Sequence, residues 1–173
     1  MITVCLHGAE STGKSVLAAQ LAAEFGCGWV PEYGRSYCEE HGTDLAMADL
    51  LAIAAGQALA VSAAAAAAPP LLLLDTDQLM TAAWAQMLLG QVPGELLSYP
   101  KADLYLLFCA DVPWIGDGTR LFGDAARRAR FAGLAQDMLV RAEVPFETIA
   151  GDWPARATAA RAAIVRLLNR IPA

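Results

Sequence analysis

Lysine, cysteine and histidine are scarce in this 173-residue chain, and charged residues of both signs are few. Two lysines stand beside ten arginines, there are four cysteines and two histidines, and charged residues make up 17% of the chain. The formal net charge of −6 disfavours a nucleic-acid partner, because nucleic-acid-binding surfaces are strongly basic. The cysteines form no CxxC pair and no Cys/His ligand spacing, so we expect buried, reduced thiols rather than disulfides or a metal-thiolate site.

A long stretch without any charge covers residues 50–74, LLAIAAGQALAVSAAAAAAPPLLLL. A membrane-spanning helix needs about 20 predominantly apolar residues. Here much of the length is alanine, and Pro69 and Pro70 would end a helix before the four leucines. We therefore expect a helix, then a buried strand, and no membrane partner. Met1 leads directly into a predicted strand, so we also expect no signal peptide and a cytoplasmic location.

Strand-like and helix-like segments alternate along the chain, which predicts an α/β fold with a parallel sheet covered by helices on both faces. Four of the five predicted strands are continuous apolar or β-branched runs, as strands buried on both faces should be. The strands are expected at residues 2–7, 28–32, 71–75, 104–110 and 145–150, and the helices at 14–25, 36–41, 45–67, 77–90, 124–142 and 154–169. Asp44 and Asp124 are expected to cap two of these helices. No linker or internal repeat interrupts the pattern, so residues 1–173 are expected to form one domain.

The octapeptide GAESTGKS follows the first predicted strand and opens the first predicted helix. It fits the P-loop pattern G-x-x-x-x-G-K-S, in which backbone N–H groups and a helix N-terminus hold phosphates. Lys14 would place its charge on the β- and γ-phosphates, and the Ser15 hydroxyl would ligate Mg²⁺. A glycine-rich turn before an amphipathic helix is the disfavoured alternative. The sequence thus predicts ATP and Mg²⁺ as ligands of Gly8, Ala9, Glu10, Ser11, Thr12, Gly13, Lys14 and Ser15.

The run LLLLDTD places two carboxylates where a hydrophobic strand is predicted to end. Asp75 lies at the strand end, where a carboxylate beside a P-loop can hold Mg²⁺ directly or through water. We expect a metal-binding or catalytic role for it. Asp77 begins the next helix, so two interpretations stay open for this residue, binding of the substrate and capping of the helix.

The stretch WVPEYGRSY places polar groups at the carboxyl end of the second predicted strand, the edge where open α/β folds bind ligands. Glu32 there is a candidate base for the hydroxyl that attacks the γ-phosphoryl group. Arg35 would bind phosphate or orient Glu32. The alternative is a surface ion pair between the two, which would contribute little.

The stretch DVPWIGDGTRLFGDAARRAR follows the fourth predicted strand and is rich in glycine. Phosphoryl-transfer enzymes close such a segment over the reaction, which excludes water and brings an arginine to the transferring group. We expect a lid at about residues 112–130, with Arg120 as its catalytic arginine. Asp117 is a candidate for binding the ribose, although the metal or the turn could also explain it. For Arg127, Arg128 and Arg130, which begin the helix that follows, a solvated basic patch is a realistic alternative.

Four motifs in this order, GAESTGKS, PEYGRSY, LLLLDTD and DVPWIGDGTR, resemble the ribosylnicotinamide kinase domain of the NadR family, a P-loop kinase-like group. The resemblance extends from Gly8 to the segment IAGDWPAR at residues 149–156. It implies a five-stranded parallel sheet of order 2-3-1-4-5 and ATP-dependent phosphorylation of nicotinamide riboside to nicotinamide mononucleotide. IAGDWPAR would lie near the adenine, with Arg156 as a candidate base-stacking residue; an ordinary arginine at a helix start is the alternative.

The acceptor is the part of the resemblance that the residues define least. Nicotinamide riboside is cationic and flat, so a carboxylate and an aromatic face would suit it. We assign Tyr33 and Trp84 to this role beside Glu32 and Arg35, although aromatic residues also serve in packing. The alternatives are a kinase for another nucleoside or small metabolite and a non-catalytic ATP-binding regulatory module. The sequence leaves the oligomeric state open.

Members of the family often carry a DNA-binding domain and an adenylyltransferase domain ahead of the kinase domain. Here the first predicted strand begins at residue 2, so we expect neither repressor nor adenylyltransferase activity. A motor of the AAA type is also disfavoured, because we identify no sensor arrangement and no additional lid domain in the sequence.

Overall fold

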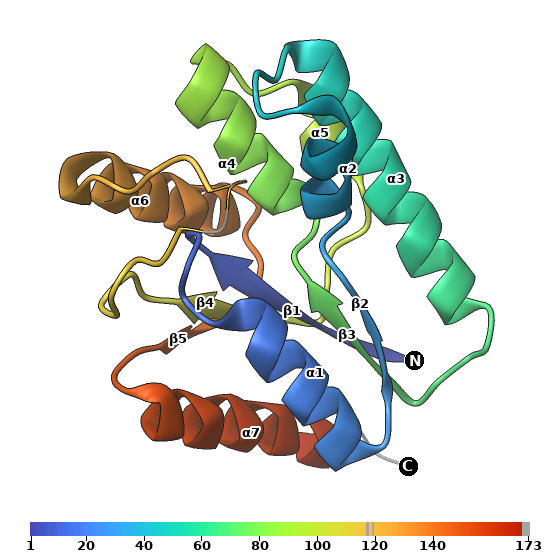
Figure 1. Ribbon diagram of the computed structural model, residues 1–173. Helices are drawn as coiled ribbons and strands as arrows, with labels where there is room; N and C mark the ends of the chain where they lie inside the picture. The colour runs from blue at the N-terminus through green and yellow to red at the C-terminus, as the bar shows by residue number, and fades with distance from the viewer. Residues whose placement is uncertain (117, 119, 171–173) are drawn as a thin grey trace.

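The computed structural model describes residues 1–116, 118 and 120–170, and its elements alternate as the sequence predicts (Figure 1). The strands are β1 (Ile2–Gly8), β2 (Gly28–Val30), β3 (Leu71–Asp75), β4 (Leu104–Phe108) and β5 (Phe146–Ile149). The helices are α1 (Lys14–Phe25), α2 (Tyr33–His41), α3 (Met47–Ala65), α4 (Gln78–Leu89), α5 (Gly94–Ser98), α6 (Ala125–Arg141) and α7 (Trp153–Arg170).

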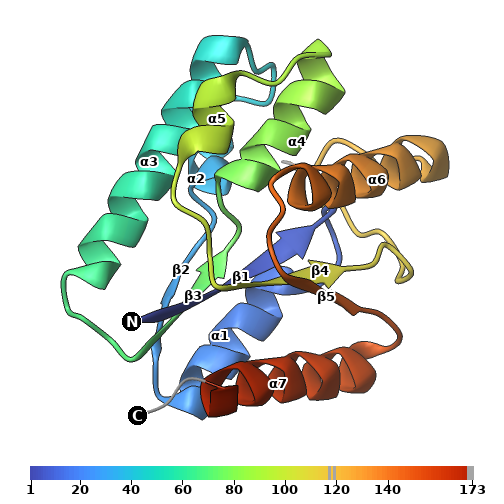
Figure 2. The ribbon, with the colours of Figure 1, turned by 180° about the vertical axis from the view of Figure 1, so that it is seen from behind.

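All five strands are parallel and form one sheet of order β2-β3-β1-β4-β5, which confirms the predicted topology. β1 lies at the centre, with Cys5 opposite Leu74 of β3 and Tyr105 of β4. Helices α1 and α7 cover one face, and α3, α4 and α6 cover the other (Figures 1 and 2). The arrangement is the three-layer sandwich expected of a P-loop kinase fold.

The pleat of the strands divides the core into two parts. On one face the strands pack against α1 and α7, and we call this part the support layer. Its buried strand residues are Val4, Leu6, Leu71, Leu73, Leu104, Leu106, Phe108 and Ile149. On the other face, called here the pocket layer, the strands pack against α3, α4, α5 and α6. Its buried strand residues include Cys5, Leu72, Leu74, Tyr105 and Leu107.

Several predicted boundaries need correction. β2 ends at Val30 rather than at residue 32, because Pro31 has no N–H group to continue the ladder. Helix α2 already begins at Tyr33, so Glu32 is the N-cap residue of α2 and not part of a strand. Strand β4 stops at Phe108, and the short helix α5 was not predicted.

The two predicted helix caps differ in outcome. Asp124 is the N-cap of α6, and its carboxylate accepts a hydrogen bond from the Arg127 N–H (2.8 Å). Asp44 is not the cap of α3, because this helix begins only at Met47 and its N-cap residue is Ala46. There Asp49, three residues inside the N-cap, accepts from the Ala46 N–H (2.8 Å). The carboxylate that closes this helix end therefore lies inside the helix rather than before it.

By length and composition alone, helix α3 is long and apolar enough to cross a membrane. Within its most apolar stretch of 18 residues, 22% is buried in the protein. Its polar contacts point instead to packing on the protein. Gln57 donates to the carbonyl oxygens of Pro31 (3.3 Å) and Thr76 (3.5 Å), and the Ala54 carbonyl accepts from the Gln78 side chain (3.0 Å). These bonds support the predicted helix of a globular fold; the absence of a membrane partner stays a prediction.

Candidate active site

The P-loop needs its two glycines. Gly8 ends β1 with φ +129°, and a Cβ atom there would lie 2.5 Å from the Phe108 carbonyl oxygen. Gly13 has φ +84°, and a Cβ atom there would lie 2.5 Å from the indole ring of Trp153. A side chain at either position would meet neighbouring atoms and strain the backbone. The loop between β1 and α1 keeps its shape only with glycine at both ends.

Lys14 is held inside this loop. It is 9% exposed, and its ammonium group donates to the carbonyl oxygens of Gly8 and Ala9, both at 2.8 Å. The Thr12 hydroxyl also donates to Ala9 (2.9 Å), so Ala9, itself fully buried, contributes through its backbone. Because α1 begins at Lys14, the positive end of the helix dipole coincides with the ammonium group. The result is a preorganised site for phosphate.

Asp75 and Ser15, the two predicted metal ligands, come together. Asp75 ends β3, is 2% exposed and forms a hydrogen bond with the Ser15 side chain. Burial raises the pKa of the Asp75 carboxyl, while the charge of Lys14 opposes that shift. Its buried Oδ1 atom has no hydrogen-bond partner within the described part of the chain. An unused carboxylate oxygen beside a hydroxyl is a fitting donor set for Mg²⁺.

A cavity of about 380 Å³ opens beside the P-loop. Its walls come from the P-loop, from α2, α3 and α4, and from the chain that follows β4. The predicted residues that line it are Gly8, Glu10, Ser11, Thr12, Gly13, Lys14, Ser15, Glu32, Arg35, Trp84 and Arg120. Thr76 of the LLLLDTD motif lines it as well, so residues of four motifs that are far apart in the sequence face one space.

Glu32 is the acidic group of the cavity beyond the P-loop. As the N-cap residue of α2 it lies half-buried at the end of β2. Burial raises the pKa of its carboxyl, the nearby Lys14 ammonium lowers it, and the Asp75 carboxylate raises it. A carboxylate with a raised pKa beside a phosphate site is suited to accept a proton from a substrate hydroxyl.

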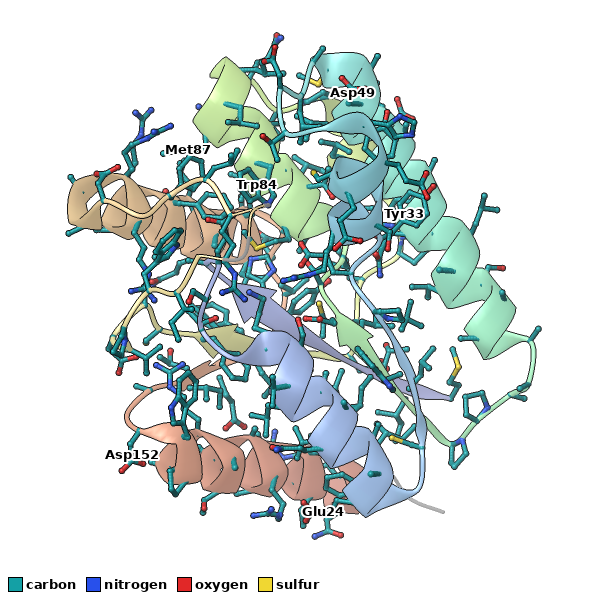
Figure 3. All side chains as sticks on the ribbon, in the orientation of Figure 1. Glu24, Tyr33, Asp49, Trp84, Met87 and Asp152 are labelled. Carbon is teal, nitrogen blue, oxygen red and sulfur yellow. The ribbon has the colours of Figure 1, made fainter. Side chains whose placement is uncertain are left out.

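Aromatic rings form one wall of the cavity. Trp84 extends from α4 toward α6 (Figure 3) and lies 4.4 Å from the Phe131 ring, centroid to centroid. Phe122 stacks on Trp84 at 5.1 Å with an interplanar angle of 27°. Trp84 and Phe131 line the cavity, and the fully buried Phe122 supports them. This wall offers apolar ring faces, inclined to each other by 52°, to an acceptor.

Two residues predicted to bind the substrate, Tyr33 and Asp77, lie outside the cavity lining as described. The Tyr33 N–H donates to the Gln57 side chain (2.7 Å). Asp77 is the N-cap of α4 and accepts from the Leu79 N–H (2.9 Å) and the Tyr105 hydroxyl. The structure therefore shows the capping alternative for Asp77. Asp117 lies outside the described residues.

Arg156 is enclosed on the other side of the P-loop. It is 1% exposed, donates to the carbonyl oxygens of Gly151 (2.7 Å) and Cys109 (3.0 Å), and forms an ion pair with Asp111. It borders a second cavity of about 340 Å³, where the half-exposed Trp153 ring lies 5.8 Å from its guanidinium group. The base-stacking role of Arg156 stays a prediction. The indole ring of Trp153 is more accessible to a base than the buried Arg156 side chain.

The arginines after β4 are tied to the P-loop more closely than predicted. Arg120 lines the main cavity and donates to the Ile115 carbonyl and to the Ser11 hydroxyl (3.5 Å). A solvated patch was the alternative for Arg128, but this residue is half-buried and donates to the carbonyl oxygens of Val112 (2.6 Å) and Ser11 (3.4 Å). The first turn of α6 points this side chain toward the loop, which the linear sequence does not reveal.

All four cysteine thiols are free as predicted, but only Cys5 is buried, while the other three are half-buried. Cys5, His7 and Asp77 offer ligand atoms that all lie within 4.8 Å of one another. His7 contacts the Ala135 carbonyl through Nε2 (2.9 Å), which assigns its proton to Nε2, and burial lowers the pKa of the ring to about 4. The ring is therefore neutral near pH 7, consistent with the structural role expected for it.

Gln57 is the main residue of the site that the sequence analysis missed. Its side chain joins the end of β2, the start of α2 and the end of β3 through bonds to Pro31, Tyr33 and Thr76. It thereby holds the segment that carries Glu32. The signal was present, because Gln57 is a large polar residue in the middle of a mostly apolar, alanine-rich helix. Other lining residues that were missed include Cys38, Thr43, Thr81 and Phe131.

Comparison with known sequences places the chain in a family. The profile of a family described as AAA domain matches residues 3–156. The trifunctional NAD biosynthesis/regulator proteins NadR of Escherichia coli (strain K12) and Salmonella typhimurium (strain LT2) are each 32% identical to it over 151 residues. These alignments cover 83% of this chain and 37% of each relative, so the chain spans little more than a third of their length.

Solved structures show the same fold. NadR in complex with NAD and AMP-PNP superposes with a TM-score of 0.75 at 22% identity, and NadR in complex with NR with 0.75 at 23%. Both cover 94% of this chain and 48% of the NadR chain. Deoxyadenosine kinase from M. mycoides reaches 0.64 at 12% identity, covering 98% of this chain and all of its own. The chain belongs to the P-loop family described as AAA domain, and its predicted likeness to the ribosylnicotinamide kinase domain of NadR is confirmed.

Proposed function

We propose that this protein transfers the γ-phosphoryl group of ATP to a hydroxyl of nicotinamide riboside and so forms nicotinamide mononucleotide. One observation carries the proposal: a single cavity joins Lys14 of the donor loop to the Glu32 carboxylate and to Arg120. A donor loop alone would also be compatible with a nucleotide-dependent regulatory protein or a motor protein. A carboxylate and an aromatic wall facing that loop supply what an acceptor needs.

The residues have distinct roles in this reaction. The P-loop N–H groups and Lys14 bind the phosphates of ATP, and Arg35 and Arg120 stabilise the charge on the transferring group. Ser15 and Asp75 would hold Mg²⁺, which would supply positive charge to neutralise the phosphates of ATP. Phosphoryl transfer gains most from positioning and charge stabilisation, so the preorganised loop is expected to supply most of the rate.

Glu32 rather than Asp75 is the better candidate for the base. Both carboxyls have raised pKa values because they are buried. Only Glu32 belongs to the lining of the cavity as described, whereas Asp75 lies behind Ser15 and hydrogen-bonds with it. In the proposed reaction Glu32 takes the proton of the acceptor hydroxyl as its oxygen attacks phosphorus.

The choice of acceptor rests on chemistry and on family. The negative charge of Glu32 and the flat faces of Trp84 and Phe131 suit a cationic aromatic ring such as that of nicotinamide riboside. The likeness to NadR, one structure of which contains NR, supports the same choice. A cytoplasmic enzyme of NAD salvage would follow from it.

The direct test is incubation of the full chain with ATP, Mg²⁺ and nicotinamide riboside. Mass spectrometry should detect a product that is heavier than the riboside by one phosphoryl group, together with ADP. A panel of nucleosides and small metabolites, scored by ADP release, distinguishes this acceptor from others. Slow hydrolysis of ATP that no acceptor accelerates would instead indicate a regulatory module.

The Glu32→Gln variant tests the assigned base. We expect kcat to fall by about 10² to 10⁴, the usual contribution of general base catalysis, with the Kd for ATP nearly unchanged. Glu39→Gln, on the exposed side of α2, is the matched control and should behave as the unaltered protein. Unchanged turnover in Glu32→Gln would assign the proton transfer to another group.

A further inference from the structure

The P-loop binds protein backbone as well as offering a site for phosphate. The carboxylate of Glu10 accepts hydrogen bonds from the Leu121 N–H, 3.1 Å from both of its oxygens, and from the Phe122 N–H at 3.1 Å. Next to it, the Ser11 hydroxyl accepts from the Ile115 N–H (2.7 Å). Two consecutive residues of the loop therefore fasten the chain that follows β4.

Phosphate binding gives no reason for an acid at position 10. A carboxylate in an anion-binding loop repels phosphate, and half-burying it costs free energy unless it is hydrogen-bonded. Here burial raises the pKa of Glu10, while the N–H groups of Phe122 and Leu121 lower it. Hydrogen bonds to a charged acceptor are about twice as strong as neutral ones, so these contacts offset the cost of the buried charge. The backbone contact, rather than the nucleotide, explains the acid.

The fastened backbone leads directly to the acceptor wall. Phe122, whose N–H is bound by Glu10, is 1% exposed and packs on Trp84 and on Phe131, at 5.1 and 5.0 Å between ring centroids. Trp84 and Phe131 line the cavity in which the acceptor is proposed to bind. A continuous path of contacts therefore runs from the donor loop through Glu10 and Phe122 to the aromatic wall.

We propose that Glu10 is a positioning residue that couples the donor site to the acceptor wall. Its carboxylate holds the backbone at Leu121 and Phe122 against the P-loop, and this contact fixes the aromatic rings that face the acceptor. Coupling between two binding sites is reciprocal, so bound nucleotide should tighten acceptor binding by the same factor by which bound acceptor tightens nucleotide binding. The acceptor part rests on the proposed function; the fastening itself does not.

Three variants separate the contact from the charge. Glu10→Ala removes all acceptor atoms, whereas Glu10→Gln keeps one side-chain oxygen that can accept from a backbone N–H. Glu39→Ala removes an exposed negative charge from α2 and serves as the control. Circular dichroism and thermal melting establish that each variant is folded. If Glu10→Ala does not fold, Glu10→Gln carries the test by itself.

Amide hydrogen exchange of the substrate-free protein tests the fastening. In Glu10→Ala, we expect the Leu121 and Phe122 amides to exchange at least about 10-fold faster, the loss expected for a charge-assisted hydrogen bond. Glu10→Gln should show a smaller increase and Glu39→Ala none. Unchanged exchange in folded Glu10→Ala, or in Glu10→Gln where it is the only folded variant, would overturn the proposal. This measurement needs no activity, so it stands even if nicotinamide riboside is not the acceptor.

Kinetics tests the coupling. With the acceptor that the unaltered protein uses, we expect the KM for the acceptor to rise by about 10-fold in Glu10→Ala, with an intermediate rise in Glu10→Gln. The factor by which an ATP analogue tightens acceptor binding should fall toward one. Faster exchange with an unchanged coupling factor would overturn the link to the acceptor wall. Failure of the unaltered protein to phosphorylate any acceptor refutes the proposed function instead.

Discussion

The two faces of the sheet are built from the same strands but carry different chemistry. In the support layer, β1, β3 and β4 present buried apolar side chains to α1 and α7, among them Leu6, Leu73 and Leu106. Only at its end does β3 present a carboxylate to this side, that of Asp75 beside Ser15 of α1. In the pocket layer β1 and β4 carry His7 and Tyr105, and the Tyr105 hydroxyl bonds the cap carboxylate of Asp77.

The difference shows where this fold buries polar groups despite the free-energy cost of removing them from water. A buried polar group destabilises a fold unless it is hydrogen-bonded, so an apolar layer is the simplest way to hold a sheet together. The pocket layer instead buries Gln57, Gln78 and Asp77, each with hydrogen bonds inside the protein. These bonds hold the ends of the strands around the cavity. Mutations that act on one face only should separate stability from activity.

The largest expected effect on activity comes from a mutation in the donor loop. Lys14→Met should lower kcat/KM by about 10³, because it removes the charge at the phosphates from a preorganised site. The only other lysine, Lys101, is half-buried and donates to the Leu97 carbonyl (2.9 Å), so Lys101→Met is a natural control. Steady-state kinetics of both variants with ATP and the acceptor provides the measurement. Equal losses in the two would contradict the role of Lys14.

A cavity created by mutation in the support layer should lower the stability of the protein but leave its activity unchanged. Leu106 of β4 is fully buried in that layer. Leu106→Ala should therefore lower the free energy of unfolding by about 2–5 kcal/mol. The KM for the acceptor should stay unchanged as long as the protein is folded. Trp84→Ala in the pocket layer should raise that KM. Urea unfolding and kinetics on both variants distinguish the layers, and a raised KM in Leu106→Ala would argue against their separation.

His7, in the pocket layer, makes the free energy of unfolding of the protein depend on pH. The unfolded chain protonates this ring below about pH 6.5, whereas the folded protein keeps it neutral down to about pH 4. Protons therefore favour the unfolded chain within this window, and stability falls as the pH drops through it, by up to about 3 kcal/mol.

The buried carboxyls act in the opposite direction. Burial raises the pKa values of Glu32, Asp75 and Asp77, so lowering the pH relieves part of their cost. The comparison of the unaltered protein with His7→Gln isolates the contribution of the ring, because glutamine does not titrate. Denaturant unfolding at several pH values should show the difference between them shrinking or reversing as the pH falls from 6.5 to 4. Parallel curves would contradict the assignment.

The smallest effect is expected at the helix cap of the pocket layer. Asp77→Asn keeps a side-chain oxygen for the Leu79 N–H but weakens the bond with Tyr105, so the free energy of unfolding should fall by about 1 kcal/mol. Because Asp77 lies outside the described cavity lining, kcat should change little. A large fall in kcat with unchanged stability would restore the substrate-binding interpretation. Thermal melts and kinetics decide between the two.

The sequence was informative wherever a feature is local. The five strands were found because each is a short apolar run between helical segments, and their parallel order followed from the resemblance of four motifs. The end of β2 was missed by two residues at Pro31, and α5 is too short to leave a clear pattern. Arg128 was misjudged, because its partners Val112 and Ser11 lie 16 and 117 residues away.

By itself, the sequence determined the donor loop. The eight residues from Gly8 to Ser15 are contiguous, their glycines are required by the backbone, and Lys14 bonds carbonyl groups only five and six residues away. Only the tertiary structure decided how that loop meets the rest of the site. Glu10 reaches N–H groups 111 and 112 residues further along the chain. Such contacts depend on the parallel pairing of β1 with β4 in the sheet, and no local pattern records that placement.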